Sequence, residues 1–176
     1  VYALVTNRQM KKYNIDKCDY ANLVISQRNW ASKNPMAVYK DPLTANEYNN
    51  APLVADPLCR YDCVPVVAGS YAIVLSRWEN KNFNKQVRIK SLFQSFNFDN
   101  QEGDGTKTGI SGFVDSLYDD AKIGPEDINV YSIYDDYPAI VLAQLNDLKI
   151  IKDNNIKGYL LNMKDNIEPL NTWGGM

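Results

Sequence analysis

The sequence of 176 residues contains no histidine, no strong excess of either charge and no long apolar run. Without histidine, the Ser-His and Cys-His pairs of the familiar hydrolases cannot form within this chain. Any proton carrier must therefore be an Asp, Glu, Tyr, Lys or Cys. The formal net charge is −2 and no basic stripe accompanies the twelve tyrosines, so the sequence disfavours nucleic-acid binding.

Apolar runs and cysteines are equally sparse. No run approaches the roughly 20 residues that span a membrane, and the first residues do not resemble a signal peptide, so no membrane association is expected. The cysteines, Cys18, Cys59 and Cys63, are three in number, which indicates reduced thiols and a cytoplasmic location. Two thiolates spaced Cys59-x-x-x-Cys63 leave a tetrahedral zinc site half empty, and no metal site is expected.

The residues that are present suit one domain or two interlocked halves, because 45% are hydrophobic. Asp16 is a plausible N-cap, and Asn34-Pro35 ends the helix that follows. Thr108 or Ser111 can cap a later helix, which Gly124-Pro125 ends. Helical apolar spacing thus predicts helices over residues 8–13, 18–32, 110–121 and 138–148.

Strand patterns lie between these helices, over residues 66–76, 86–92, 128–134 and 159–163. The first is apolar on both faces, as in a central strand covered on both sides. Residues 34–65 contain five prolines and no sustained period, which predicts a long irregular covering segment near a functional site. Strand, helix, strand, helix in this order predicts an α/β fold with partly parallel pairing.

One junction concentrates polar chemistry, because the predicted strand 128–134 leads through Tyr134, Asp135, Asp136 and Tyr137 into the next helix. Ligands in α/β sheets collect at such places, where free N–H groups stabilise negative charge. A phenol from Tyr134 can donate a hydrogen bond to an oxyanion or enolate, worth about 3 kcal/mol in a dry site, and Asp135 can orient it. Alternatively, Asp136 caps the helix, Tyr137 packs and Tyr134 is a half-buried aromatic.

A second candidate lies at Asn171-Thr172-Trp173-Gly174-Gly175. Two adjacent glycines let a backbone approach a ligand closely, or they form a plain turn. The candidate binding residues are therefore Asn171, Gly174 and Gly175.

Four ordered segments carry a family resemblance: RNWASKNPMAVYKDPLT, ADPLCRYDCVPVVAGSYAIVL, AKIGPEDINVYSIYDDYPAIVLAQLNDL and NTWGG. They resemble the thiolase superfamily, specifically the lipid-transfer or sterol-carrier-protein-type thiolases, which are similar to acetyl-CoA acetyltransferases. The resemblance implies a partial thiolase fold, an α/β mixed sheet covered by helices with an irregular loop domain. It assigns residues 1–65 to the loop or cap segment, 66–80 to the last strand of the N-terminal half and 86–176 to an incomplete C-terminal half.

The family makes or breaks carbon–carbon bonds next to a coenzyme A thioester. It uses a nucleophilic cysteine and a histidine in a Gly-His-Pro segment, and the resemblance places both outside this chain. We therefore expect the isolated chain to be an inactive fragment, with a coenzyme A thioester as substrate and no tightly bound cofactor.

The junction matches a family segment in which Tyr134 takes the place of a histidine or asparagine. A tyrosine there is similar to the thiolase-like aldolases that act on steroid side chains. Asp136 replaces a cysteine, and a carboxylate beside an oxyanion site opposes negative charge, which disfavours plain thiolase activity. Three hypotheses remain: an acyltransferase, a retro-aldolase using Tyr134, and a non-catalytic subunit of a complex. The resemblance also implies a homodimer and a small zinc-ribbon and OB-fold partner protein.

Overall fold

The computed structural model describes residues 1–77, 87–166 and 168–175. Its α-helices are α1 (Tyr2–Tyr13), α2 (Lys17–Ala31), α3 (Ala45–Asn49), α4 (Val114–Ala121), α5 (Pro138–Asp147) and α6 (Ile156–Asn162). Two short strands, β1 (Leu53–Ala55) and β2 (Leu58–Cys59), pair antiparallel. Single 3-10 turns lie at Arg60–Asp62, Phe98–Gln101, Gly109–Gly112, Pro125–Asp127 and Lys152–Asn154.

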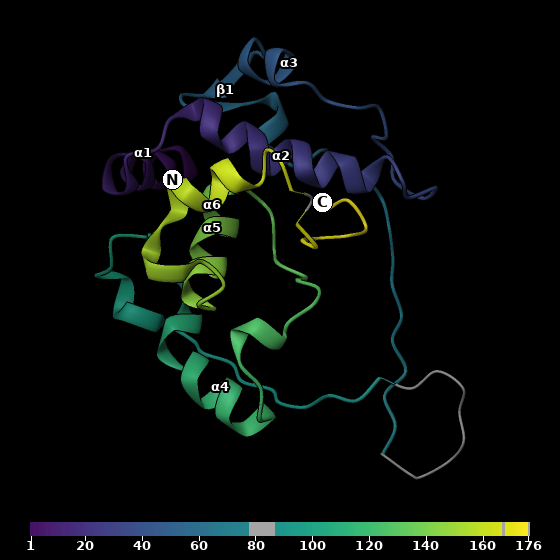
Figure 1. Cartoon of the computed structure of the whole chain (residues 1–176), viewed down its shortest axis with the longest axis vertical. Helices are drawn as coiled ribbons and strands as arrows, with labels where there is room; N and C mark the ends of the chain where they lie inside the picture. Colours follow the sequence, from purple (N-terminus) through teal and green to yellow (C-terminus); the bar gives the residue numbers. More distant parts are fainter. Residues whose placement is uncertain (78–86, 167, 176) are drawn as a thin grey trace.

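Four of the helices, α1, α2, α5 and α6, form the helical body of the molecule. Helix α2 packs against both α5 and α6, and α1 packs against α5 (Figure 1). Their shared core includes leucines that are fully buried, namely Leu23, Leu142, Leu145 and Leu160. Each such side chain contributes about 1.5–3 kcal/mol relative to remaining in water, so this core holds the body together.

Local sequence signals explain the limits of α2 and α5. Asp16 is the N-cap of α2, as predicted, and its N–H donates to the Asp19 carboxylate at 2.8 Å. The helix ends at Ala31, before Asn34-Pro35. Pro138 starts α5, where its missing N–H costs nothing. Both predicted helices are confirmed.

Two other predicted helices are confirmed with different limits. Helix α1 begins at Tyr2, six residues earlier than expected. Thr108 caps the segment 110–121, because its hydroxyl accepts the Ile110 N–H at 3.3 Å. That segment starts as a 3-10 turn, and α4 takes only its second part.

The predicted strand 159–163 is wrong, because these residues belong to α6 and its end. Asn155 caps this helix, its side-chain oxygen accepting the Gly158 N–H at 2.9 Å. Ile156, Leu160 and Met163 are buried at helical spacing. A short apolar run fits both the helical and the strand period. Here the helix forms because it buries these side chains in the core.

The covering segment 34–65 is more regular than predicted, since it contains α3, β1 and β2. Thr44 opens α3 with a reciprocal cap. The Glu47 carboxylate accepts the Thr44 N–H at 2.8 Å, and the Thr44 hydroxyl accepts the Glu47 N–H at 3.2 Å.

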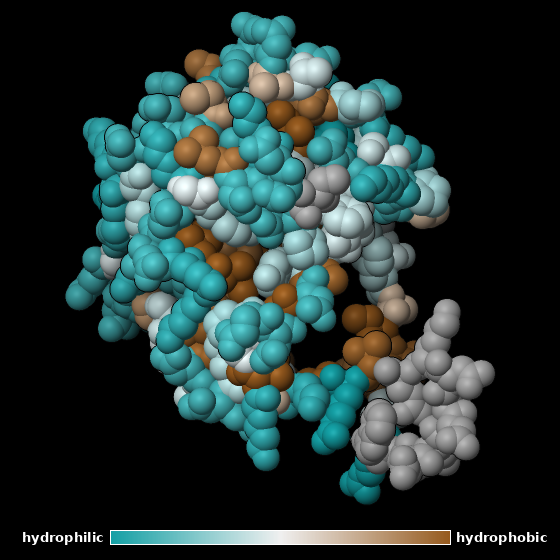
Figure 2. Space-filling view, in the orientation of Figure 1, coloured by the Kyte–Doolittle hydropathy of each residue, from teal (hydrophilic) through white to brown (hydrophobic). Residues whose placement is uncertain are grey.

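The predicted central strand 66–76 is not formed, and residues 66–75, here named the apolar arm, are irregular and exposed. Val66, Tyr71 and Val74 are 104%, 98% and 93% exposed. Within the described ranges the arm pairs with no other segment. Figure 1 shows it running away from the helices, and Figure 2 shows apolar surface where it meets the grey segment. A strand needs a neighbour for its backbone hydrogen bonds, and the arm has none there.

The remaining strand predictions are met in part or not at all. Gln86 and residues 78–80 lie outside the described residues, and 87–92 is irregular. Segment 128–134 makes one parallel bridge, from Tyr131 to Leu170. The α/β class is thus confirmed in a helix-rich form with a small sheet, while the division into three thiolase segments stays a prediction.

Candidate functional site

A parallel bridge brings the two predicted site segments together. The Tyr131 N–H donates to the Pro169 carbonyl at 2.9 Å, and the Asn171 N–H donates to the Tyr131 carbonyl at 2.8 Å. With the contacts of Ile133 to Asn171 and of Asp135 to Gly175, this brings residues 131–135 beside 169–175, although some forty residues separate them along the chain. We call this place the junction site.

Asn171 acts on the backbone of the junction. It is fully buried and left-handed, with φ of 46°. Its side-chain oxygen accepts the Ile133 N–H at 2.8 Å. Its amide nitrogen is buried with no hydrogen-bond partner among the described residues. Direct contact between Asn171 and a substrate stays a prediction.

Gly174 and Gly175 need to be glycines because of what they approach. Their φ values are 113° and 80°, which side chains rarely adopt. A Cβ on Gly174 would lie 2.6 Å from the Ala31 Cβ, and one on Gly175 would lie 2.0 Å from the Asp135 carboxylate. The turn thus fits closely against α2 and the junction.

The Asp135 carboxylate is held by α2. Gln27 donates from its side-chain nitrogen to Asp135 Oδ2 at 2.9 Å. Helix α5 has Tyr137 as its N-cap, with no side-chain cap hydrogen bond, so the alternative that Asp136 caps it is wrong. Gln27 could not be found from the sequence, because a glutamine inside a helix gives no signal of a partner 108 residues away.

Tyr134 is 57% exposed, so the described residues do not form the dry site in which its phenol would be a strong donor. Its carbonyl accepts a hydrogen bond from Gln144 of α5 at 2.6 Å. The pKa of the Tyr134 phenol is raised, mainly by partial desolvation and to a smaller extent by the negative charge of Asp136 and a hydrogen bond to Asp136. Tyr137 stacks on Tyr2 of α1 with ring centroids 4.3 Å apart, which confirms that Tyr137 packs.

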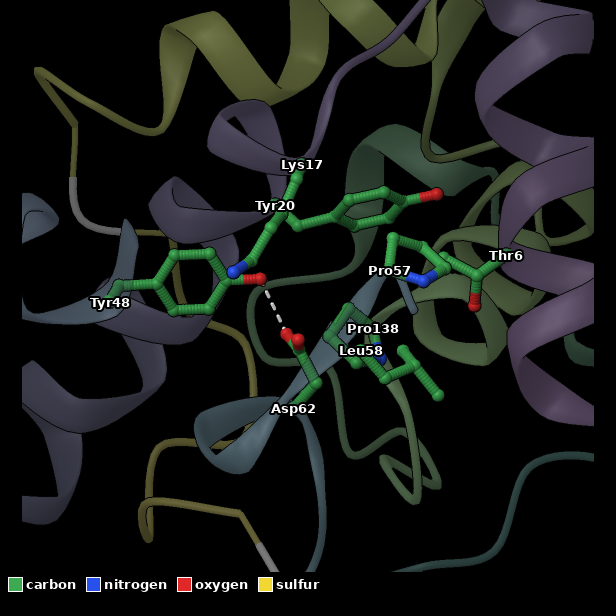
Figure 3. Close-up of a pocket in the computed structure, with 8 residues that line it drawn as sticks. All are labelled: Thr6, Lys17, Tyr20, Tyr48, Pro57, Leu58, Asp62 and Pro138. Carbon is green, nitrogen blue, oxygen red and sulfur yellow. Dashed lines mark hydrogen bonds between the residues drawn. The ribbon is translucent and has the colours of Figure 1, made fainter. Parts of the chain in front are cut away.

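A small cavity lies near the start of α5, lined by Thr6, Tyr48, Asp62 and Pro138 among others (Figure 3). Its volume of about 10 Å³ holds about one water molecule. The Tyr48 hydroxyl donates to Asp62 at 2.5 Å, and the other Asp62 oxygen accepts the Cys59 N–H at 2.7 Å. Burial raises the pKa of Tyr48 and of the nearby Tyr20. These hydrogen bonds lie within the covering segment and hold α3 against β2 and the turn Arg60–Asp62.

A larger groove of about 340 Å³ borders the junction site, because Tyr131 and Ile133 belong to both. It runs between residues 88–91, α4 and residues 128–133, with mostly apolar side chains such as Leu117, Val130 and Ile133. Neither Tyr134 nor Asp135 lines it.

Metal ligands and membrane spans were also searched over the described residues. That part of the chain holds no group of three or more His, Cys, Asp or Glu side chains placed to bind a metal. None of its helices has the length and apolar character needed to cross a membrane.

The known proteins that resemble this chain include a thiolase subunit and an aldolase. Benzoylsuccinyl-CoA thiolase subunit BbsB of Thauera aromatica is 28% identical, over 88% of this chain and 44% of that protein. A steroid side-chain-cleaving aldolase of Thermomonospora curvata is 25% identical, over 98% of this chain and 48% of that protein. No family model matches. The chain spans about half the length of the curated relatives it matches.

The fold agrees with these relatives. A solved structure described as "Ltp2-ChsH2(DUF35) aldolase" superposes with a TM-score of 0.73 and 19% identity, over 99% of this chain and 49% of that one. Sequence and fold together identify this as a thiolase-like chain with a partial thiolase-like α/β fold. The relatives that support this are enzymes.

Proposed function

We propose that the complete protein makes or breaks a carbon–carbon bond next to a coenzyme A thioester. The observation that carries the proposal is the close fit of Gly175 against Asp135 and Gln27 in a chain that resembles both a thiolase subunit and a steroid aldolase. The 176-residue chain has no histidine, so we expect it to be inactive alone. The reaction then needs a nucleophilic cysteine and a Gly-His-Pro segment from elsewhere in the protein.

Tyr134 is the proposed oxyanion or proton donor. A tyrosine phenol is already protonated at neutral pH, and the raised pKa of Tyr134 leaves it so, which means that the hydroxyl can donate to developing negative charge. Helix α5 begins four residues later, at Pro138, and the positive end of its dipole favours charge in the same place. Asp135 is the proposed orienting group. The exposed Tyr134 ring becomes covered when substrate or the rest of the protein packs over it.

A retro-aldolase is the second candidate, favoured by Tyr134 itself and by the steroid side-chain-cleaving aldolase that aligns with 98% of this chain. In such a step a base takes the proton of a β-hydroxyl group and the Cα–Cβ bond breaks. The β-carbon becomes a carbonyl, and the bonding electrons leave as a thioester enolate, which then takes a proton. Asp136 beside Tyr134 opposes anionic intermediates, so the phenol's proton and the positive end of α5 must together outweigh it for an enolate to form there.

Turnover of the intact gene product decides between the two reactions. We expect activity with acetoacetyl-CoA plus coenzyme A for an acyltransferase, and with a β-hydroxyacyl-CoA for a retro-aldolase. Tyr134→Phe should lower kcat by roughly 100-fold or more, the usual value of one oxyanion donor, while Tyr13→Phe on α1 serves as the hydroxyl-loss control. If Tyr134→Phe leaves the rate unchanged, the phenol takes no part in the mechanism. If the protein turns over neither substrate, the proposal that it is such an enzyme is wrong.

The third candidate is a non-catalytic thiolase-like subunit of a complex. Subunit BbsB and the two-component name of the structural neighbour support a partner protein, and we propose one of the zinc-ribbon and OB-fold type. The coding sequence on either side of this chain tests this candidate. If it encodes neither the nucleophilic cysteine nor the Gly-His-Pro segment, the non-catalytic subunit is favoured. Coding sequence that holds both would exclude it.

We also propose that two copies associate, since Ile73, Val74 and Leu75 of the apolar arm are 84%, 93% and 75% exposed, and exposed apolar strands pair readily. Light scattering should then give twice the monomer mass, whereas a clean monomer at high concentration contradicts it. The free thiols Cys18, Cys59 and Cys63 support the cytoplasmic location, which stays a prediction.

A further inference from the structure

Helix α2 presents one face to the junction site. Gln27 and Ala31 are four residues apart, so they lie on the same side of the helix, one turn from each other. Ala31 meets Gly174, and Gln27 meets both Gly175 and Asp135. This single face therefore touches both segments from which the site is built.

The hydrogen bond from Gln27 fixes where the Asp135 carboxylate lies. It joins the side-chain nitrogen of Gln27 to Asp135 Oδ2 at 2.9 Å, on a helix whose neighbours Leu23, Val24 and Ser26 are buried. The donor is thus mounted on a packed element. A neutral amide holds the carboxylate and leaves its negative charge in place. A lysine or arginine in the same position would neutralise that charge.

The glycine turn closes the other side. A Cβ on Gly175 would stand 2.0 Å from Asp135 Oδ2 and 3.2 Å from the Gln27 side-chain nitrogen. The turn therefore passes directly over the hydrogen bond. The Asp135 side chain is in this way confined between α2 and the turn, while the adjacent Tyr134 ring faces outward.

We propose that Gln27 is a positioning residue, which holds the Asp135 carboxylate where it orients the bound substrate. This inference rests on the proposed function, because orientation matters only if the junction site carries out chemistry. It adds a residue from α2, within the predicted loop or cap segment 1–65, to a site that the sequence placed entirely in the C-terminal half.

Turnover of the intact gene product tests this role through a double-mutant cycle. Gln27→Met keeps the shape and removes the donor, and it should lower kcat roughly 10- to 100-fold with little change in KM, as small misplacements do. Adding Gln27→Met to Asp135→Asn should cause no further loss. Asn22→Leu removes an amide from the same helix and should leave kcat unchanged. Losses that multiply in the double variant would overturn the role, as would a kcat that Gln27→Met leaves unchanged.

Nuclear magnetic resonance of the same protein separates this inference from the proposed function. The side-chain amide signals of Gln27 should shift as the pH is lowered and Asp135 takes a proton, and Asp135→Asn should abolish that shift. If the shift occurs but neither thioester is turned over, the proposed function fails and the Gln27–Asp135 contact stands as structure only. If the pH-dependent shift of the Gln27 signals is absent, or is unchanged by Asp135→Asn, the inference is wrong whether or not the protein turns over either thioester.

Folding is checked with a reciprocal pair. The double variant Gln27→Glu with Asp135→Asn exchanges donor and acceptor. It should therefore keep the hydrogen exchange protection of the Gly174 amide, which donates to the Asn171 carbonyl at 2.7 Å, and Gln27→Met should weaken that protection. The double variant should not restore kcat, because the carboxylate then sits on α2. Full recovery of kcat in this pair would show that the contact only stabilises the fold, and it would overturn the positioning role.

Discussion

The helical body and the apolar arm are made of the same kinds of residue and end in opposite environments. Leu142 and Ile156 in the body are 0% and 1% exposed, whereas Ile73 and Val74 in the arm are 84% and 93% exposed. Helices satisfy their own backbone and need only cover one face, but an extended segment needs a neighbouring strand as well. Apolar composition is therefore not sufficient for burial. An extended apolar segment is buried only where another strand pairs with its backbone.

Leucine truncation should show the largest difference between the two regions. Leu142→Ala should lower the free energy of unfolding by about 2–5 kcal/mol, because it leaves a cavity in the packed core. The matched change Leu75→Ala in the arm should alter it by less than about 0.5 kcal/mol in dilute solution. Urea denaturation measures both, and similar losses at the two positions would break the comparison.

Glycine substitution should show a smaller difference of the same kind. Gly175→Ala should cost about 1–2 kcal/mol, because φ is 80° there and the new Cβ meets Asp135. In the arm, a Cβ on Gly69 would meet only the Tyr71 ring, at 4.0 Å. Gly69→Ala should therefore leave the unfolding midpoint unchanged. Thermal unfolding checks both, and an undisturbed Gly175→Ala would show that the turn is not tightly packed.

The dependence of stability on alkaline pH should give the smallest effect. Burial raises the pKa of Tyr48 and Tyr20, whereas tyrosines in the unfolded chain lose their protons near pH 10. Above that pH the unfolded state holds fewer protons than the folded state, so stability falls as pH rises.

Tyr48→Phe should reduce this fall by up to about 1.4 kcal/mol per pH unit, the value of one proton. Tyr71→Phe, at an exposed ring in the arm, should leave it unchanged. Unfolding at pH 9, 10 and 11 measures the slope, and equal slopes in wild type and Tyr48→Phe would contradict a buried, protonated phenol.

Local signals made α2 and α5 predictable, because Asp16, Pro35 and Pro138 act within a few residues of where they stand. The limits of α6 were not predictable, since a run from Tyr159 to Met163 fits either period until the core is known. The pairing of Gln27 with Asp135 could not be predicted either, because it depends on tertiary packing alone.

The junction site was located in part from the sequence. The sequence marked both the Tyr134–Asp135 segment and Gly174-Gly175 as candidates, but the approach of Gly175 to Asp135 was not predicted, because it depends on tertiary packing. The exposure of Tyr134 did not follow from the sequence, because what covers a ring depends on residues far away in the chain. The strand predicted for the apolar arm is absent for the same reason. Its apolar pattern is typical of a strand, but a strand forms only where another segment lies beside it to accept its backbone hydrogen bonds.

Hydrogen exchange of the arm at rising protein concentration tests the central claim most directly. We predict that amides of Val141–Leu145 in α5 are protected at every concentration. Amides of residues 66–75 should exchange freely in dilute monomer and gain protection as two copies associate. An arm already protected in the monomer, or one still unprotected in a stable dimer, would contradict the account that these residues form a strand only with a partner.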